Sequence, residues 1–297
     1  MKRACLILFL LMPWIAMAQI EGAIDLHVHS APDSMPRALT AIETAQLARR
    51  HGMRAVLFKN HFVETATLAY LVSQVVPEVE AYGGIALNRS VGGINAAAVE
   101  QMAAMTGGHG RVVWMPTVDA AQGPFAAAVE QANILPVSDN GVLLPEVVSM
   151  LELIAKLDLA LATGHSSPQD SLLLVRAANE LGIERIVITH PLEDLSMSVA
   201  VQREVVSLGA LLEFPIAMAA PIGRISFEEF TAQIRAIGPE NVVLSTDLGQ
   251  AANPVPAVGF AMGVARLLEA GFTQREVDLM IRRNPAKILN LSVTEFD

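Results

Sequence analysis

The sequence predicts an α/β protein that folds as a single (β/α)8 TIM barrel. Eight short apolar segments of β type alternate with amphipathic helical segments along the chain. Five of the seven histidines lie at or just past the end of one of these β segments. No linker, low-complexity tract or block of charge divides the chain, so we expect one domain over 19–297.

The β segments are short and rich in valine, isoleucine and leucine, as in parallel strands buried on both faces. We expect strands at 23–28, 54–59, 82–87, 111–116, 159–164, 185–190, 209–214 and 241–246. The segment 82–87 carries the weakest signal because two glycines dilute it.

Helical periodicity fills the intervals between the strands, and several of these segments begin at a capping residue and end at a glycine. We expect helices at 40–51, 64–76, 95–106, 144–157, 170–181, 198–208, 226–237 and 256–270, and a last one at 273–283 that runs into Asn284-Pro285. The longest irregular stretch, 117–143, is a candidate active-site loop.

Eight βα units at this spacing indicate a closed barrel of ordinary size. The alternative is an open, doubly wound sheet. Such a sheet usually carries a glycine-rich phosphate loop after its first strand, whereas the first segment here ends in Asp-Leu-His-Val-His (25–29). The pattern therefore favours the barrel.

The first eighteen residues have the order of a cleaved secretory signal. Lys2 and Arg3 precede an apolar stretch, and Ala16-Met17-Ala18 is a small-x-small cleavage site. The apolar stretch is too short for a membrane anchor and contains a proline. We expect an exported protein, periplasmic or secreted, that begins near Gln19 and leaves the only cysteine, Cys5, behind.

The charge of the chain bears on its partners. The formal net charge is −10, and loss of Lys2 and Arg3 takes it to −12. An acidic protein is poorly suited to bind nucleic acid or an anionic membrane surface. We expect neither as a partner, but a small-molecule substrate, and the sequence is compatible with a homo-oligomer.

The five strand-end histidines are the informative feature, because the C-terminal ends of the strands form the catalytic face of a (β/α)8 barrel. They are His27, His29, His61, His165 and His190. A single buried histidine is usually a core residue, but five on one rim are hard to explain by packing. They indicate a metal site.

Within this set, His27-Val28-His29 is the strongest local signal. Residues i and i+2 of a strand point to the same side, so both imidazoles can bind one ion. Asp247 emerges from the apolar strand Val-Val-Leu-Ser-Thr, where an unpaired carboxylate is costly to bury. Imidazole with carboxylate suits Zn²⁺, with Mn²⁺ or Fe²⁺ as alternatives.

These positions together resemble the amidohydrolase superfamily of metal-dependent hydrolases, as does the tail Arg-Arg-Asn-Pro-Ala-Lys-Ile-Leu. Segments 59–62, 91–95 and 113–117 are similar to an uncharacterised amidohydrolase-like family. The resemblance implies that His27, His29 and Asp247 hold one metal, and that His165 and His190 hold or border a second. It also implies that Asp247 acts as base toward a metal-activated water.

One departure concerns the residue that bridges two ions. Members with two metals usually carry a carboxylated lysine or a glutamate at the end of the fourth strand, and this chain reads Val-Val-Trp-Met-Pro-Thr there. Lys59, at the end of the second strand with His61 beside it, is either carboxylated and bridging, or a free ammonium that orients an anionic substrate. Both place Lys59 and His61 in the catalytic site.

Further polar or aromatic side chains near strand ends are candidates for substrate binding. They are Asn60, Asn88, Asn95, Trp114 and Glu213. For Glu213, on the seventh strand, a structural ion pair is the alternative.

Three functions are open at this point. The first is hydrolysis of an amide, cyclic amide or ester-type bond in a small molecule by metal-activated water. The second is phosphoester hydrolysis on the same barrel. The third is an exported metal- or ligand-binding barrel without turnover.

Overall fold

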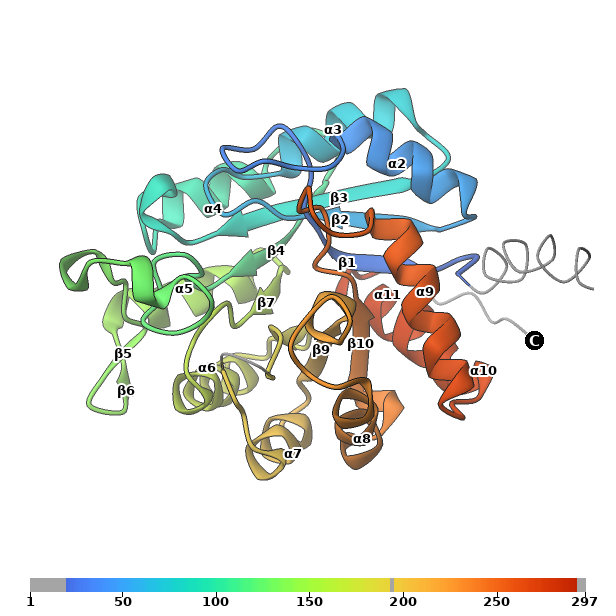
Figure 1. Cartoon of the computed structure of the whole chain (residues 1–297). Coiled ribbons are helices and arrows are strands. Elements are labelled where there is room, and N and C mark those ends of the chain that lie inside the picture. Colours follow the sequence, from blue (N-terminus) through green and yellow to red (C-terminus); the bar gives the residue numbers. More distant parts are fainter. Residues whose placement is uncertain (1–19, 193–194, 293–297) are drawn as a thin grey trace, which may run out of the picture.

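The computed structural model describes residues 20–192 and 195–292, which form a nearly closed parallel barrel surrounded by helices (Figure 1). The eight strands follow the order of the chain around the barrel, β1-β2-β3-β4-β7-β8-β9-β10, and the pairs within this sheet are parallel. They are β1 (Ile24–Val28), β2 (Ala55–Phe58), β3 (Glu80–Ala86), β4 (Gly110–Trp114), β7 (Ala160–Ala162), β8 (Ile186–Ile188), β9 (Leu211–Pro215) and β10 (Val242–Ser245).

The barrel closes between its first and last strands, just past their C-terminal ends. The amide of His29 donates to the carbonyl of Leu248 at 2.9 Å, and the amide of Asp247 donates to the carbonyl of His27 at 2.8 Å. Val28 and Leu248 form a parallel bridge there. This seam confirms the barrel and excludes the open, doubly wound sheet.

The helices pack on the outside, and those after each strand return the chain to the next strand, as Figure 1 shows. They are α2 (Ala41–Arg50), α3 (Ala66–Val75), α4 (Ala96–Ala103), α5 (Pro145–Lys156), α6 (Pro168–Glu180), α7 (Val199–Ser207), α8 (Phe227–Ile237), α9 (Pro256–Glu269), α10 (Gln274–Asp278) and α11 (Asn284–Ile288). Short 3-10 turns lie at Arg89–Val91, Ala126–Ala128, Gln131–Asn133, Ile216–Met218 and Pro239–Asn241. None of the described helices is long and apolar enough to cross a membrane.

Two elements differ from the expectation. The last helix does not end before Pro285, because a π turn at Leu279–Arg283 (η6) leads directly into α11 with the proline in its first turn, where no amide donor is needed. Strand β3 begins earlier and is longer than 82–87. Its glycines permit close packing, since a Cβ on Gly83 would lie 2.3 Å from the carbonyl oxygen of Thr65.

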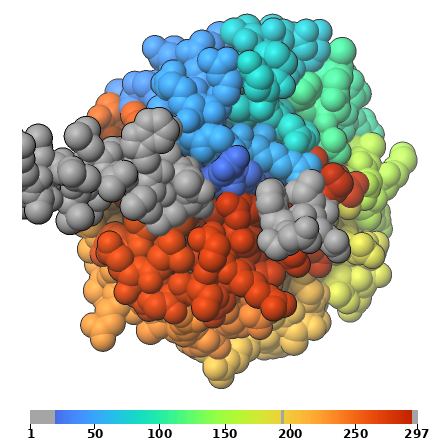
Figure 2. Space-filling model, turned by 90° about the vertical axis from the view of Figure 1, so that its right-hand side faces the viewer, coloured from blue at the N-terminus to red at the C-terminus, as the bar shows by residue number. Residues whose placement is uncertain are grey.

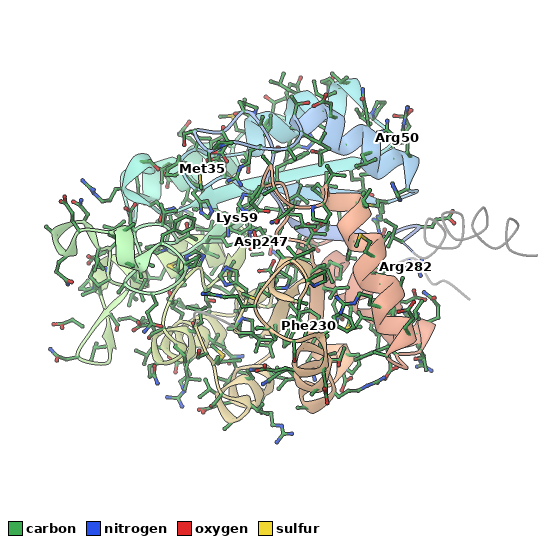
Figure 3. All side chains as sticks on the ribbon, in the orientation of Figure 1. Met35, Arg50, Lys59, Phe230, Asp247 and Arg282 are labelled. Atoms are coloured by element: carbon green, nitrogen blue, oxygen red, sulfur yellow. The ribbon has the colours of Figure 1, made fainter. Side chains whose placement is uncertain are left out.

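The apolar core has two layers. The larger one lies between the strands and the helices. The smaller one fills the barrel interior with side chains such as Leu26, Leu57 and Trp114. Ile288 and Leu289 close the interior at the N-terminal ends of the strands. Figure 2, which views this end, shows the C-terminal helices in red beside the first described residues in blue. The side chains drawn in Figure 3 show Lys59 and Asp247 near the centre of the molecule, close to the other end of the barrel.

Candidate metal centre

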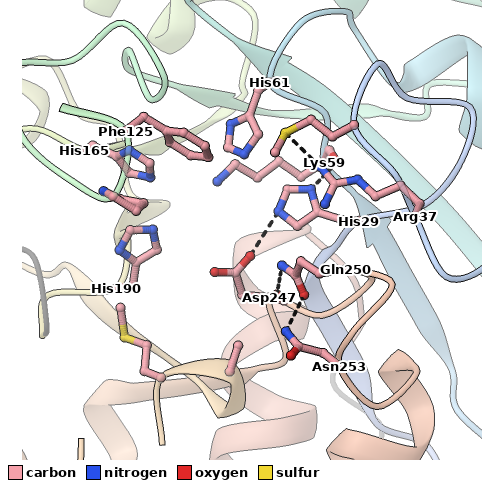
Figure 4. A pocket seen from close by; sticks show the side chains of 14 residues that line it. His29, Arg37, Lys59, His61, Phe125, His165, His190, Asp247, Gln250 and Asn253 are labelled. Carbon is pink, nitrogen blue, oxygen red and sulfur yellow. Dashed lines mark hydrogen bonds and ion pairs between the residues drawn. The ribbon is translucent and has the colours of Figure 1, made fainter. Parts of the chain in front are cut away.

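Five histidines form a closed circuit at the C-terminal ends of strands β1, β2, β7 and β8. They are the five that the sequence places there. Four of them, His29, His61, His165 and His190, line one cavity (Figure 4), and His27 adjoins His29 and His190. Neighbouring ring centroids are 5.1 Å apart for His27 and His29, 5.1 Å for His29 and His61, 6.3 Å for His61 and His165, 4.8 Å for His165 and His190, and 6.2 Å for His190 and His27.

A register irregularity in β1 turns His27 toward the site. Ile24 and Leu26 belong to the barrel interior, so strict alternation would point His27 outward with Asp25. The pairing of β1 with β2 shifts between Asp25 and Val28. The buried Asp25 carboxylate accepts from the amides of His27 (3.2 Å) and Thr246 (3.0 Å), which holds this bend in place. Irregularities of this kind commonly re-aim a side chain beside a functional site.

The innermost cluster joins β1 to the end of β10. One carboxylate oxygen of Asp247, Oδ1, lies 3.1 Å from Nε2 of His27 and 3.0 Å from Nε2 of His29. One ligand atom from each of the three residues lies within 4.8 Å of the others. Two imidazole nitrogens and a carboxylate oxygen at this separation could hold a divalent ion.

The second nitrogen of each imidazole is already engaged, and this decides which one faces the cluster. Nδ1 of His27 donates to Oε1 of Glu213 at 2.8 Å, and Nδ1 of His29 donates to the backbone carbonyl of Lys59 at 3.0 Å. Both partners are acceptors, so the protons reside on Nδ1 and the Nε2 lone pairs point at the cluster. Metal-binding histidines are oriented in this way, and the donor set fits a metal.

Of the two histidines on the far side of the cavity, His165 follows the same pattern and His190 does not. Nδ1 of His165 donates to the carbonyl of Thr117 at 2.9 Å. Nδ1 of His190 is buried and has no hydrogen-bond partner among the described residues. A buried polar atom without a partner is unusual and costs free energy, so it points to an unfilled role. His165 and His190 could hold or border a second ion, which stays a prediction from the sequence.

The charge states favour metal binding. Burial lowers the pKa of His29 and of His190 to about 4, so both imidazoles are neutral near pH 7. Burial opposes ionisation of Asp247, but the neighbouring side chains of His27, His29 and His190 hold the pKa of this carboxyl well below its usual value. Neutral imidazoles and an ionised carboxylate are the forms that bind metal.

Two of the site residues have strained backbones. His190 has φ of 23° and Asp247 has φ of 50°, a region that residues other than glycine rarely adopt. Each terminates a strand and turns its side chain into the cavity. Such strain persists only where the surrounding structure imposes it, and it is concentrated at functional sites.

Lys59 lies at the centre of the cavity (Figure 4). Its Nζ is 3.0 Å from Nε2 of His27 and 5.5 Å from the ring centroid of Trp114. Burial lowers the pKa of its ammonium, and Asp247 and Glu213 oppose that shift. His61 stands beside it, with Nδ1 2.9 Å from Oγ1 of Thr117.

The cavity has a volume of about 280 Å³ and two kinds of wall. Part of it is apolar, and Phe125, from the 117–143 loop, stacks on His165 with ring centroids 6.2 Å apart. The polar part includes Arg37, Gln250 and Asn253, which sequence reasoning missed. No pattern in the sequence marks these three, because they lie in irregular loops that become neighbours only when the barrel closes.

The five residues expected to bind substrate do not line this cavity. Glu213 is buried beneath the cavity. It pairs with His27 and accepts a hydrogen bond from the Ser245 hydroxyl at 2.7 Å, as in the structural ion pair that is the alternative prediction for this residue. Asn60 accepts from the amide of Phe62, and Asn95 caps α4.

The remaining two are also structural. The buried Asn88 ties the β3 end to the β4 end, because it donates to the His61 carbonyl and accepts from the Thr117 amide. Trp114 is buried in the barrel interior. The three asparagines thus satisfy backbone groups near the strand ends instead of reaching the cavity.

Structures with this fold are known. An organophosphorus hydrolase from Deinococcus radiodurans matches with a TM-score of 0.59 and 17% identity, over 92% of this chain and 93% of that one. A protein engineered for organophosphate hydrolysis from a weak, promiscuous lactonase template matches with a TM-score of 0.61 and 17% identity, over 92% and 97%. An amidohydrolase from Pseudomonas aeruginosa matches with a TM-score of 0.59 and 10% identity, over 94% and 98%.

These matches, at 10–17% identity, confirm the (β/α)8 barrel fold. No protein of curated function matches this sequence. The model of a family of unknown function, DUF6282, matches residues 22–213, which include the five histidines of the circuit, Lys59 and Glu213. The chain therefore belongs to the DUF6282 family.

Proposed function

We propose that this protein is a metal-dependent hydrolase that cleaves an amide, cyclic amide or ester-type bond of a small molecule. The observation that carries the proposal is the cluster of His27, His29 and Asp247, in which both imidazoles are oriented by acceptors behind them. A cluster so prepared, at the catalytic face of a barrel and open to a cavity, supports hydrolysis better than a purely structural role.

Zinc is the ion we propose, with Mn²⁺ or Fe²⁺ as alternatives, because the ligands combine imidazole and carboxylate. Such an ion lowers the pKa of bound water and polarises the scissile bond. Asp247 is the proposed base, since its carboxylate is ionised and partly exposed to the cavity. It would accept the proton of the attacking water and deliver it to the leaving group.

Lys59 keeps two proposed roles. If its amine is carboxylated, it bridges two ions, one on the side of His27 and one on the side of His165 and His190. If it stays an ammonium, it orients an anionic part of the substrate. The central position of Nζ and its contact with His27 support a place in the catalytic site for both roles. His61, stacked beside His29, would assist as a second proton carrier.

Phosphoester hydrolysis is the second candidate function. It is favoured by the likeness to organophosphorus hydrolase structures, and by cationic side chains in the cavity. The lactonase template among those structures supports ester-type substrates equally. An exported binding barrel without turnover is the third candidate.

Metal analysis tests the proposal first. Protein purified without chelator should contain at least one tightly bound divalent ion per chain. His27→Ala and His29→Ala should each lose it, because each removes an imidazole ligand that water cannot replace at similar affinity. His51→Ala is the matched control, a histidine that follows α2 outside the cavity. Unchanged metal content in both site variants would overturn the ligand assignment.

Turnover is then tested with the metal-loaded protein on amides, lactones and phosphotriesters. Hydrolysis that is lost with the metal and restored by its addition supports the enzyme. The preferred class of bond decides between the first two functions. Full metal content with no turnover on any class would favour the binding barrel.

A further inference from the structure

An arginine enters the cavity from a loop that the sequence did not single out. Arg37 lies in the segment between β1 and α2, and its side chain is only 3% exposed. In Figure 4 it lies on the His29 side of the cavity, across from His165 and His190. Burying a cationic side chain costs free energy unless an opposite charge pairs with it.

The guanidinium is held rigidly. Its Nε donates to Oδ2 of Asp33 at 2.7 Å, and its Nη2 forms an ion pair with the same oxygen at 2.7 Å and donates to Sδ of Met35 at 3.9 Å. The Asp33 side chain is fully buried. Oδ1 of Asp33 in turn accepts from the amide of Met35 at 3.1 Å. Nη1 of Arg37 donates to none of the residues that the structure describes. One edge of the guanidinium is therefore anchored, and another is left for a ligand.

The loop that carries Arg37 is fixed to the loop that follows β10. Ala38 donates from its amide to the Gly249 carbonyl at 2.8 Å, and Arg37 pairs with Gln250 in an antiparallel bridge. The Gln250 amide donates to the Asp247 carbonyl at 2.8 Å and accepts from Asn253 at 3.0 Å. Arg37, Gln250 and Asn253 thus form a preorganised polar wall beside the base.

The cavity wall exposes more cationic than anionic side chains although the chain is acidic. The side chains that line the cavity include two cations, Arg37 and Lys59, and one carboxylate, Asp247, which is committed to the metal cluster. Two further carboxylates lie behind the wall, where Asp33 pairs with Arg37 and Glu213 with His27. A divalent ion would add further positive charge. Planar guanidinium groups with a free edge recognise carboxylate and phosphoryl oxygens through paired, charge-assisted hydrogen bonds.

We propose that the substrate carries an oxyanionic group, a carboxylate or a phosphoryl group, and that Arg37 binds it on the His29 side of the metal cluster. The apolar wall with Phe125 and Met218 then accommodates the remainder of a small substrate. That the bound anion is a substrate rests on the proposed hydrolytic function. The anion site itself depends only on the side chains of the cavity.

The test measures binding instead of turnover. Three probes of similar size are titrated into zinc-loaded protein by calorimetry: 3-phenylpropionate, 2-phenylethylphosphonate and the neutral 3-phenylpropionamide. We expect at least one anion to bind about tenfold or more tightly than the amide, as a charge-assisted pair provides. The better of the two anions identifies the group as carboxylate or phosphoryl.

Arg37→Gln should abolish most of this preference, so that the anion binds about tenfold more weakly than to the wild type. Because this change leaves Asp33 buried and unpaired, the double variant Asp33→Asn/Arg37→Gln is measured as well. Arg49→Gln is the matched control, because Arg49 is an exposed arginine of α2 that also pairs with a carboxylate, Glu78. Circular dichroism and zinc content verify that each variant is folded and loaded.

The outcomes separate this inference from the proposed function. If the amide binds as well as both anions, or if the folded variants retain the preference for anions, direct contact with the metal or an adventitious site explains binding, and the inference is wrong. Hydrolysis can still be present in that case. If the preference depends on Arg37 but no substrate is hydrolysed, the anion site stands and the proposed hydrolase does not.

Discussion

At the scale of single residues, the site depends on what stands behind each ligand. His27 is aimed by a bend in β1 that Asp25 stabilises, and its proton is fixed by Glu213. His29 is fixed by a backbone carbonyl. The ligands could be predicted from the sequence because histidines at strand ends are a visible pattern. Their supporting residues could not, because they come from strands that are distant in the chain.

Asp247 is the residue on which the proposed chemistry depends. Asp247→Asn keeps an oxygen that can coordinate a metal, but an amide cannot accept the proton of the attacking water near neutral pH. We expect substantial metal retention and a loss in kcat of at least about a hundredfold, since general base catalysis contributes about 10²–10⁴. The measurement is kcat at matched metal occupancy. Near wild-type turnover in the fully metallated variant would exclude Asp247 as the base and direct attention to His61.

Glu213 offers a test of the support behind a ligand. Glu213→Gln retains the shape and can still accept from Nδ1 of His27, but the negative charge that strengthens this imidazole as a donor is lost. We expect zinc affinity to fall by about 10–100-fold, as for other partners of metal-bound histidines. Competition with a chelator measures it, with the exposed Glu78→Gln as control. Equal affinities would mean that Glu213 serves packing alone.

At the scale of elements, the sequence predicted the eight strands and most helices to within a few residues, since apolar runs and helical periodicity are local properties. The continuation of the last helix through Pro285 was missed, because a π turn leaves no signature in the residues. The polar wall of the cavity was missed for a related reason. Arg37 and Gln250 meet only through the pairing of two irregular loops.

Gly249 shows how tightly these loops are joined. It has φ of 133°, and a Cβ there would lie 1.9 Å from the carbonyl oxygen of His29. Gly249→Ala must therefore displace either the seam or His29. We expect a destabilisation of about 2–4 kcal/mol, combining backbone strain with overpacking, and weaker metal binding.

Gly271→Ala is the matched control for Gly249→Ala. Its φ is also positive, at 84°, but a Cβ would meet nothing within 4 Å. It should cost only about 1–2 kcal/mol and leave metal affinity unchanged. Urea denaturation of both variants, followed by chelator competition, separates the two effects. Equal results for both glycines would show that the seam tolerates movement.

At the scale of the whole molecule, the proposed location is outside the cytoplasm. The segment that predicts it, 1–18, lies outside the described residues, so the prediction stays with the sequence. We expect a bacterial host that expresses the full chain to release a form beginning near Gln19. An Ala18→Arg variant, which breaks the small-x-small site, should stay uncleaved. N-terminal sequencing of an exported wild-type form that starts at Met1 would contradict the prediction.

The seam of the barrel has a consequence for when the protein can acquire its ion. Two ligands come from the first strand and the third follows the last, so residues 27 and 247 must meet before the cluster exists. A nascent chain lacks the third ligand until nearly all of its strands have been synthesised. If the chain is exported in unfolded form, it can bind its metal only after translocation, from the ions available at its destination. The bound ion would then link the first strand to the loop after the last strand, and so stabilise the closed barrel against opening.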